Sequence, residues 1–442
     1  MNKILFAISA AVSLSAFGAP FVDPQSVVLS QSGGKTSITY TLTGDPAIIT
    51  LDIQTNTTGT ADGPWVSIGE SNIRYLSGAV NRLVREVGVP QRIEWKAGRS
   101  WPKMVIPGPN TRAVVTAWAT NMPPDYMVVD LTQPKTVNYY ASSNAIPGGM
   151  QSEVYKTSKL VMRKISAAGV RWRMGSPSSQ VQPSTQVQKE TPHFVTLTSD
   201  YYMGVYEVTQ KQYQNIYENA GVDYSGPLKG SKPSSFKNMA DSDRRPVESI
   251  NLVILRGDKA GYNWPEQADR FAVDPDRVLG KFRAYVGGGI LFDLPSEAEW
   301  EFACRAGVLA KYYDGRDDGS ATNLAWSNAS EYEGGTAETR PVGLLEPNGF
   351  GLYDMLGNVS EMCQDWYDSK SSVPPDEVID PMGLLEAEII SDDRDRLTRG
   401  GWYSSDPVSW CRCGARYRVA PDVNWGVNSN GFRLYAPAVV GD

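Results

Sequence analysis

The chain has 442 residues, of which 41% are hydrophobic and 21% are charged, and its 42 Lys and Arg residues against 49 Asp and Glu residues give a net charge of −7. This length is enough for two globular domains, and the acidic balance argues against nucleic-acid binding, which usually needs a basic surface. The single histidine, His193, excludes metal sites built from three histidines and argues against a Ser-His-Asp triad.

Residues 1–18 are predicted to be a secretory signal peptide. Lys3 supplies the positive charge, residues 4–17 are apolar apart from small serines, and Ala16 and Gly18 suit the two recognition positions of a cleavage site. A membrane anchor is the alternative, but the apolar run is short for a span and no stop-transfer pattern follows it. We therefore expect a secreted or periplasmic protein with no membrane insertion after cleavage.

Residues 19–135 are predicted to form a small all-β sandwich. Four stretches combine β-branched residues with period-two alternation, and turn signals lie between them. These stretches are residues 37–42, 48–53, 113–118 and 126–131. One helix is expected around Ser77 to Val87. No catalytic constellation lies in this region, so we expect an accessory or adhesive domain.

Residues 136–154 are predicted to be a linker, because they hold clusters of Ser, Asn, Pro and Gly. Residues 155–437 are rich in turns, and only two stretches indicate helices. One begins behind Thr209. The other begins at Ser296, which forms a capping-box pattern with Glu299 three residues later.

Two long segments and three shorter ones are the most distinctive features of residues 155–437. They are LPSEAEWEFACRAG at 294–307, PNGFGLYDMLGNVSE at 347–361, PHFVTL at 192–197, RGGW at 399–402 and GFRL at 431–434. Taken in chain order, the segments resemble the motifs of the formylglycine-generating enzyme, or sulfatase-modifying factor, family. The resemblance implies an α+β domain with the family's C-type-lectin-like fold, in which helices are few, strands are short and loops are long.

Calcium is the first cofactor that the resemblance implies, because the family pins its loops with this ion and oxygen ligands suit it. A first site would use the side chains of two acidic residues and two main-chain carbonyls. These are Asp354, Gly357, Val359 and Glu361. A second site would use Asn323 and the carbonyl of Leu324, but the carboxylate that should complete it does not align cleanly, and Glu333 is only near the expected place.

Copper is the second cofactor of the family, whose enzymes oxidise a cysteine of a client sulfatase to formylglycine with O₂. The resemblance places two copper-binding thiolates a few residues after Gly400-Gly401, and thiolates are the ligands that Cu(I) prefers. Here Ser405 falls at or near the first position and Val408 near the second. The chain is thus a divergent member that lacks the cysteine pair, and copper is not expected. A relocated pair made of Cys411 and Cys413 is the alternative.

The four cysteines all lie in the last third of the chain. An even number of cysteines in an exported protein suits two disulfides, with three possible connectivities, and four buried thiols are the alternative. The family resemblance implies a bridge between Cys304 and Cys413, which would leave Cys363 to pair with Cys411.

The missing thiolates favour a non-oxidase binding or structural module over an enzyme. Aromatic residues crowd the region of the family's active cleft, and aromatic side chains suit peptide and glycan recognition. They are Trp402, Tyr403, Trp410, Tyr417 and Trp425. The cleft candidates are Ser405, Trp402 and Arg416, the last of which aligns with an arginine that holds the client peptide. Two alternatives are a formylglycine-generating oxidase and another enzyme on the same fold.

Overall fold

The structure is a computed structural model that divides into two compact units, residues 1–119 and 120–442. It describes residues 18–32, 35–56, 58, 63–101, 110–180, 190–223, 230–257, 270–318, 321, 323–330, 337–367, 375–383, 395–419 and 428–441. Residues 1–17 of the predicted signal peptide lie outside the described residues, and so do Glu333 and Trp425. Within the described part, no helix has the length and apolar character needed to span a bilayer.

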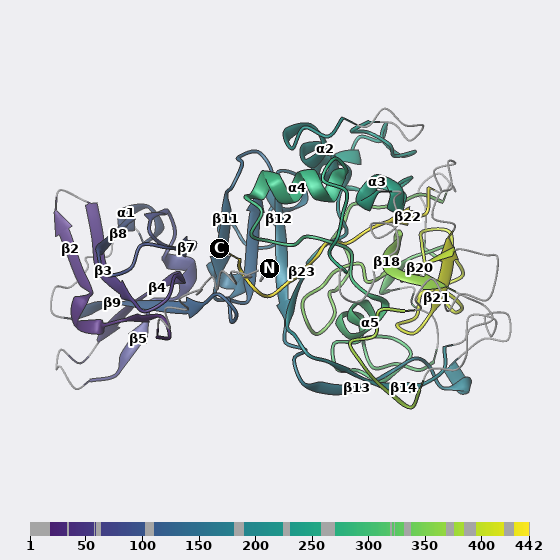
Figure 1. Ribbon diagram of the computed structural model, residues 1–442, viewed down its shortest axis with the longest axis horizontal. Helices are drawn as coiled ribbons and strands as arrows, with labels where there is room; N and C mark the ends of the chain where they lie inside the picture. The colour runs from purple at the N-terminus through teal and green to yellow at the C-terminus, as the bar shows by residue number, and fades with distance from the viewer. Residues whose placement is uncertain are drawn as a thin grey trace, which may run out of the picture. The chain divides into compact units, whose positions relative to one another are not determined.

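The N-terminal unit contains two sheets that share one core (Figure 1). The first sheet has the order β1-β3-β8-β6, with β2 also paired to β3, and the second has β5, β7 and β9 paired to β4. The strand bounds are β1 Phe21–Val22, β2 Val28–Ser32, β3 Lys35–Thr43, β4 Ala47–Asn56, β5 Trp65–Ser67, β6 Leu76–Gly78, β7 Leu83–Val84, β8 Pro90–Trp95 and β9 Thr111–Ala119.

The core of this unit follows from the alternation in its strands. Ile38, Tyr40 and Leu42 of β3 are buried, and they face one cluster with Ile49 and Ile53 of β4. The intervening residues of β3 are more exposed, as expected for strands with one face on a core. The predicted β-sandwich is therefore confirmed.

Two details of this region differ from the sequence prediction. The helix expected at residues 77–87 is absent, because Gly78 (φ 93°) and Asn81 (φ 56°) adopt backbone conformations that a right-handed helix excludes, and the stretch contains parts of β6 and β7. The strand expected at 126–131 exists as β10 (Tyr126–Asp130), but it pairs with strands of the second unit. The division therefore falls at residue 119, before the expected boundary at 135.

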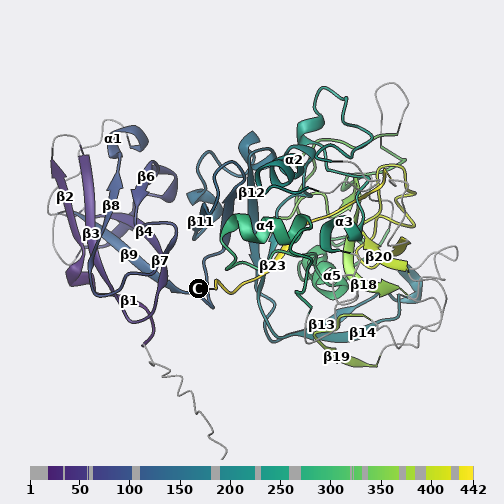
Figure 2. The ribbon, with the colours of Figure 1, turned by 45° about the horizontal axis from the view of Figure 1, so that its top comes forward.

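The second unit is α+β, with short strands, few helices and many loops, as predicted. Its five-stranded antiparallel sheet has the order β11-β10-β12-β15-β23, and a three-stranded sheet joins β13, β14 and β19 (Figure 2). A four-stranded sheet has the order β21-β20-β18-β22, and β16 pairs with β17. The remaining strand bounds are β11 Val137–Tyr140, β12 Lys159–Ile165, β13 Val170–Met174, β14 His193–Leu197, β15 Tyr201–Gly204, β16 Ala325–Trp326, β17 Leu356–Gly357, β18 Ser360–Tyr367, β19 Glu377–Ile379, β20 Asp395–Arg399, β21 Arg416–Val419, β22 Asn430–Gly431 and β23 Tyr435–Pro437.

Short helices complete both units. The α-helices are α1 Ala97–Ser100, α2 Gln210–Asn219, α3 Leu252–Arg256, α4 Val278–Val286 and α5 Glu297–Arg305. The 3₁₀ turns are Pro24–Ser26, Glu70–Asn72, Ser143–Ala145, Glu153–Lys156, Ser178–Gln180 and Ser242–Arg244. The two predicted helices are α2, capped by Thr209, and α5, capped by Ser296, and each has the expected capping box.

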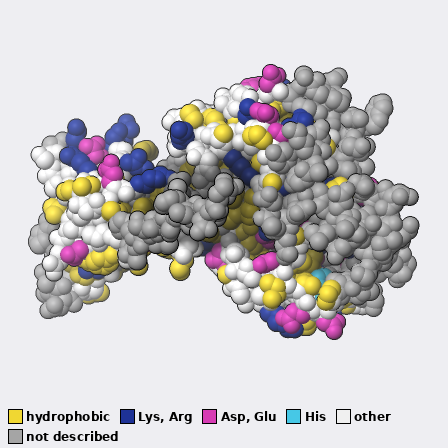
Figure 3. Space-filling view, in the orientation of Figure 1, with side chains coloured by type: hydrophobic (Ala, Val, Ile, Leu, Met, Phe, Trp, Pro, Cys, Tyr) yellow, Lys and Arg dark blue, Asp and Glu magenta, His cyan; other side chains and the backbone are white. Residues whose placement is uncertain are grey.

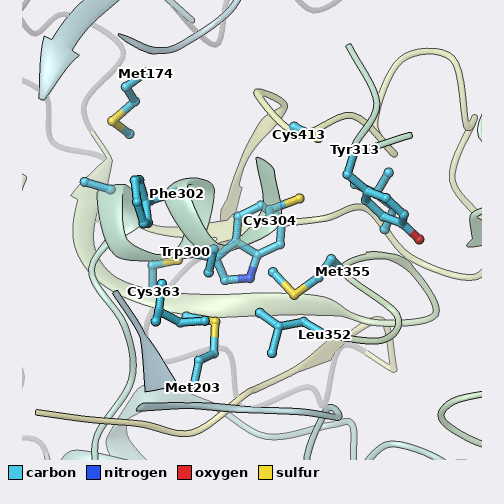
Figure 4. Packing of buried hydrophobic residues seen from close by; sticks show 14 of the residues in the cluster. Met174, Met203, Trp300, Phe302, Cys304, Tyr313, Leu352, Met355, Cys363 and Cys413 are labelled. Carbon is cyan, nitrogen blue, oxygen red and sulfur yellow. The ribbon is translucent and has the colours of Figure 1, made fainter. Parts of the chain in front are cut away.

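Helix α5 lies in the centre of the second unit's core. All nine of its residues are buried, and Figure 4 shows Trp300 surrounded by side chains from other segments. These neighbours include Met203, Leu352, Met355 and Cys363. Because three of the nine buried residues are glutamates, the helix needs partners for its charges.

Candidate functional site

Arginines from α5 itself and from distant segments neutralise two of the buried glutamates of α5. Glu301 accepts from Arg305 Nε (2.7 Å) and from Arg399 of β20. Glu297 pairs with Arg399 Nη2 (3.0 Å) and with Arg416 of β21. These bonds hold both ends of the segment 400–415 against the helix, and this segment is the one that should carry the copper thiolates.

Ser405 stands where the first thiolate is expected, and its hydroxyl is used to close a turn. Ser405 Oγ donates to the carbonyl of Trp402 (2.8 Å) and accepts from the N–H of Trp402 (3.1 Å). The side chain is buried. The hydroxyl of Ser405 is therefore engaged in the local turn.

Cys411 lies beside Ser405, which the sequence analysis did not foresee. Its Sγ is 3.4 Å from Ser405 Oγ, and a Cβ on Gly401 would stand 2.8 Å from the same sulfur. Burial raises the pKa of the Cys411 thiol to about 12. The sequence signal for this contact is the short loop between Gly401 and Cys411, which brings the cysteine back towards the first thiolate position.

Cys411 and Cys413 have different neighbours, because residues 411–414 form bends and turns and not a strand. The neighbouring thiol of Cys304, in α5, lowers the pKa of the Cys413 thiol. Cys363 of β18 lies near Asp365 and Arg399. All four cysteines are buried free thiols in the structure, so the pairings Cys304–Cys413 and Cys363–Cys411 stay predictions.

Three aromatic rings form a partly exposed cluster over the same segment. The ring centroids of Trp402 and Tyr417 are 5.0 Å apart, those of Trp410 and Tyr417 are 5.3 Å apart, and those of the two tryptophans are 6.3 Å apart. Tyr403 is instead buried and packs edge-on against Phe236. We call Trp402, Trp410 and Tyr417 the aromatic cluster.

Arg416 begins β21 next to this cluster, and its charge already has a partner. Its Nε and Nη2 donate to the two carboxylate oxygens of Glu297 at 2.6 Å and 2.9 Å. The guanidinium also lies 5.7 Å from the ring centre of Tyr367. A bidentate pair fixes the orientation of an arginine, so here Arg416 positions the strand that carries Tyr417.

The two carboxylates of the expected first calcium site are both buried, but they differ in their partners. Glu361 is bound on both oxygens by Arg433 (2.7–3.0 Å) and also accepts from Trp300 Nε1 (2.6 Å). Asp354 accepts one bond from the N–H of Gly343 (2.6 Å), and its other oxygen, Oδ1, has no hydrogen-bond partner among the described residues.

A third carboxylate, Glu207, lies in the same region and was missed by the sequence analysis. It accepts from Asn358 Nδ2 (2.7 Å) and from the N–H of Val359 (3.1 Å), and so holds the Gly-Asn turn. Burial raises its pKa strongly, and Asp354 and Glu361 raise it further. Glu207 lies two residues before Thr209, the predicted start of a helix, and its sequence position gives no sign of the contact with the turn at 358–359.

The residues fit a bound cation at Asp354 and not at Glu361. Burial raises the pKa of Asp354 to about 6, and its unpartnered oxygen offers a ligand. Glu361 is already neutralised by Arg433. In the described residues no group of three or more His, Cys, Asp or Glu side chains is arranged to hold a metal, so any ion here would depend on main-chain carbonyls.

The second expected calcium site is described only in part. Asn323 is exposed, and the carbonyl of Leu324 accepts a bond from Tyr313 (3.3 Å). The candidate carboxylate, Glu333, is outside the described residues, so this prediction stays open.

The comparison with protein families shows to which family the second unit is related. Residues 151–437 match the model of the sulfatase-modifying factor enzyme 1-like domain. The chain belongs to this family. The formylglycine-generating enzyme of Bos taurus is 32% identical over 322 residues, which cover 67% of this chain and 80% of that protein. The expected family and the expected fold are therefore confirmed.

Other relatives are matched over shorter lengths. The chaperone protein LppX of Paenibacillus barcinonensis is 32% identical over 197 residues, and the formylglycine-generating enzyme of Mus musculus is 32% identical over 154 residues. The matches span 64% and 38% of those two proteins. Treponema denticola variable protein 1 (24% identity, TM-score 0.44) and PvdO from Pseudomonas aeruginosa (21%, TM-score 0.45) are similar solved structures, and each match covers 63% of this chain and 95% or 94% of that structure.

Proposed function

We propose that the chain is an exported, non-oxidase member of its family that binds a peptide or glycan at the aromatic cluster. The observation that carries this proposal is Ser405, whose hydroxyl is engaged in a turn at the expected first thiolate position, while Val408 near the expected second position offers no ligand. Cu(I) prefers soft thiolate ligands, and a hydroxyl that is engaged in a turn cannot replace one. The thiol of Cys411, which lies beside Ser405, has its pKa raised by burial to about 12, so it stays protonated at neutral pH.

The aromatic cluster supports the binding part of the proposal. Trp402, Trp410 and Tyr417 are neither fully buried nor fully exposed, so part of each ring is open to a ligand, and aromatic rings contribute large contact areas to binding surfaces. The segment that presents them is fixed at both ends by the ion pairs of Arg399 and Arg416. A rigid aromatic surface loses little conformational entropy when it binds a ligand.

Calcium is part of the same proposal and would serve the fold. Asp354 Oδ1 and the carbonyls of Gly357 and Val359 would hold the ion, with Glu361 left in its pair with Arg433. A bound cation would offset the excess of carboxylates in this buried region and fix the turn at Gly357 and Asn358.

The alternative function is a formylglycine-generating oxidase. It is favoured by similar proteins that carry this name and by the thiol of Cys411 next to the first thiolate position. Such an enzyme would have to hold copper with one thiolate from Cys411 and a second ligand of another kind. Another enzyme on the same fold is a further alternative.

A conversion assay separates these functions. Purified protein, copper and O₂ are mixed with a peptide that carries the Cys-x-Pro-x-Arg motif, and the aldehyde is sought by mass spectrometry beside an active family enzyme. We expect no conversion. Formation of the aldehyde at a rate that Cys411→Ser abolishes would overturn the proposal in favour of the oxidase.

The binding part is tested on peptide and glycan arrays. We expect Trp410→Ala and Tyr417→Ala to lose at least tenfold in affinity for a ligand that the wild-type chain retains. Trp65→Ala, in the N-terminal unit, is the matched control and should keep the affinity. Equal binding by all three variants would contradict a role for the aromatic cluster. Export is tested separately, by the N-terminal sequence of the protein recovered after secretion from a bacterial host.

A further inference from the structure

The turn that calcium would fix lies against the segment that carries Trp402 of the aromatic cluster. The N–H of Gly357 donates to the carbonyl of Gly400 (2.8 Å), and the N–H of Tyr403 donates to the carbonyl of Asn358 (2.9 Å). Trp402 therefore lies between two residues that are hydrogen-bonded to the turn. The ion pairs described above fix the ends of this segment, whereas these two backbone bonds fix its middle.

The turn and the segment are also packed too closely to move independently. A Cβ placed on Gly400 would lie 2.9 Å from the carbonyl oxygen of Met355 and 3.3 Å from the ring of Trp300. Trp300 in turn donates its Nε1–H to Glu361 (2.6 Å), one of the two carboxylates of the expected calcium site. Because a close-packed interior transmits small displacements, a change at the calcium site should reach Gly400.

The end of the turn is held by an asparagine whose side chain is fully bonded. Asn358 Nδ2 donates to Glu207 (2.7 Å) and to the carbonyl of Arg340 (3.1 Å), and Asn358 Oδ1 accepts from the N–H of Arg340 (2.9 Å). At the start of the same turn, Asp354 Oδ1 is buried and has no hydrogen-bond partner among the described residues. The protein's own groups therefore fix the end of the turn, and a carboxylate oxygen at its start is left for a ligand.

Repulsion between like charges works against an ordered turn when no cation is bound. Glu207, Asp354 and Glu361 are all buried, and Arg433 forms its ion pair with Glu361. Glu207 lies close enough to the two other carboxylates for their charges to repel its own. A calcium ion bound to Asp354 would offset this repulsion and stabilise the arrangement in which the turn meets the segment.

The carboxylates of this site lie inside the fold and not on its surface. Asp354 is 2% exposed and Glu361 is 1% exposed. On the face of the molecule that Figure 3 shows, the Asp and Glu side chains of the described residues are scattered among Lys and Arg side chains and form no broad acidic patch. An effect of calcium on the segment is therefore expected to come from the buried site, and a substitution at Asp354 should remove it.

We propose that calcium bound at Asp354 regulates the aromatic cluster, so that the chain binds its ligand at least fivefold more tightly with the ion than without it. This inference rests on the proposed function, since it concerns the ligand of the same cluster. The ion fixes the turn, the backbone bonds of the turn fix the middle of the segment, and Trp402 is presented in one arrangement. A ligand that meets an ordered surface loses less conformational entropy. By linkage, the ligand raises the affinity for calcium by the same factor.

Hydrogen exchange tests this connection without any ligand. In a chelator-washed sample, the exchange rates of the Gly357 and Tyr403 amides are measured with and without about 1 mM calcium, a concentration at which extracellular proteins bind this ion. We expect calcium to slow both amides at least fivefold, because both donate the bonds that join the turn to the segment. The Lys281 amide, bonded to the carbonyl of Arg277 in α4 (2.9 Å), is the control and should not change. The proposal is overturned if calcium slows Gly357 alone, neither amide, or all three amides equally.

Ligand affinity tests the regulation itself and keeps the two proposals apart. The peptide and glycan arrays are probed with and without calcium, and the affinity for a retained ligand is measured by isothermal titration calorimetry under both conditions. We expect at least fivefold tighter binding with calcium. A ligand bound equally tightly under both conditions contradicts the regulation and leaves the proposed function standing. A chain that retains no ligand under either condition contradicts the proposed function and, with it, the regulation of a ligand; the exchange rates then show whether calcium still orders the segment.

Two matched variants locate the effect. Asp354→Asn removes the carboxylate with the unpartnered oxygen, so calcium should change neither its exchange rates nor its ligand affinity. Asp276→Asn makes the same chemical change at a carboxylate of the same unit whose side chain is 80% exposed, and it should respond to calcium like the wild-type chain. A full calcium response in Asp354→Asn would place the ion elsewhere and refute the assignment. The comparison within the wild-type chain decides the outcome if Asp354→Asn does not fold.

Discussion

Glu301 offers the sharpest test of how the second unit is held together. Its side chain is fully buried, and its carboxylate accepts bonds from Arg305, from Arg399 and from the N–H of Gly175. The Glu301→Gln variant keeps the shape of the side chain but leaves two buried guanidinium groups without this counter-charge. Removing one partner of a buried ion pair typically costs about 3–5 kcal/mol.

The lowered pKa of Glu301 gives a second way to obtain the free energy that its ion pairs contribute. Burial alone would raise this pKa, but Arg305 and Arg399 outweigh burial and lower it from 4.5 to about 2. A difference of this size corresponds to about 3 kcal/mol. Because the folded-state pKa is lowered, the stabilisation is fully present above about pH 4.5, and it is lost as the pH falls towards 2.

The assay is urea unfolding followed by tryptophan fluorescence, with the transitions of the two units fitted separately. The control is Glu377→Gln, which breaks the exposed pair of Glu377 with Arg171 (2.8 Å) in the same unit and should cost only about 0.5 kcal/mol. Between pH 4.5 and 2.5 the stability of the wild-type unit should fall more steeply than that of Glu301→Gln. A loss in Glu301→Gln no larger than in the control would refute the ion-pair argument.

Three further predictions concern the metal and thiol sites. Calcium should raise the melting temperature of the wild-type chain in a chelator-washed sample, whereas Asp354→Asn should respond little, because Asp354 offers the unpartnered oxygen; no shift in either protein would contradict the calcium proposal. Ser405→Cys should retain about one Cu(I) per chain after reduction, measured by competition with bicinchoninate, because its new thiol would stand next to Cys411; stoichiometric copper in the wild-type chain would instead support an oxidase. Protein secreted into an oxidising compartment should show a Cys304–Cys413 bridge in a non-reducing peptide map, and four alkylatable thiols after unfolding would disprove it.

Much of the fold was predictable because its signals are local or belong to long motifs. The sandwich strands follow from alternation in residues 37–42 and 48–53, and the α5 helix follows from the capping box at Ser296. The boundary between the units was not predictable in this way. The strand at 126–130 has a strand-forming composition like the sandwich strands, and only its long-range pairing with β12 shows to which unit it belongs.

The sequence shows which side chains the candidate site lacks, but it does not show which of the side chains present contact one another. The absence of cysteine from residues 400–410 is visible in the sequence, but the approach of Cys411 to Ser405 depends on how the loop between Gly401 and Cys411 folds. The partner of Arg416 could not be foreseen either, since Glu297 lies 119 residues earlier. The fold decides which charges distant in sequence form ion pairs. The partner of a charged residue cannot be predicted from that residue alone.

The motifs that identify this family are, in this chain, residues that hold the scaffold. Glu301 and Glu297 of one motif bind Arg399 of a second, and Glu361 of a third binds Arg433 of a fourth. Removing Glu301 or Glu361 alone leaves the buried Arg305 or Arg433 without its carboxylate partner, which costs several kcal/mol. The copper positions have no such constraint, because Ser405 satisfies its own hydrogen bonds within a turn. A chain can therefore lose the thiolates and keep every motif, so motif matches in this family predict the fold more strongly than the activity.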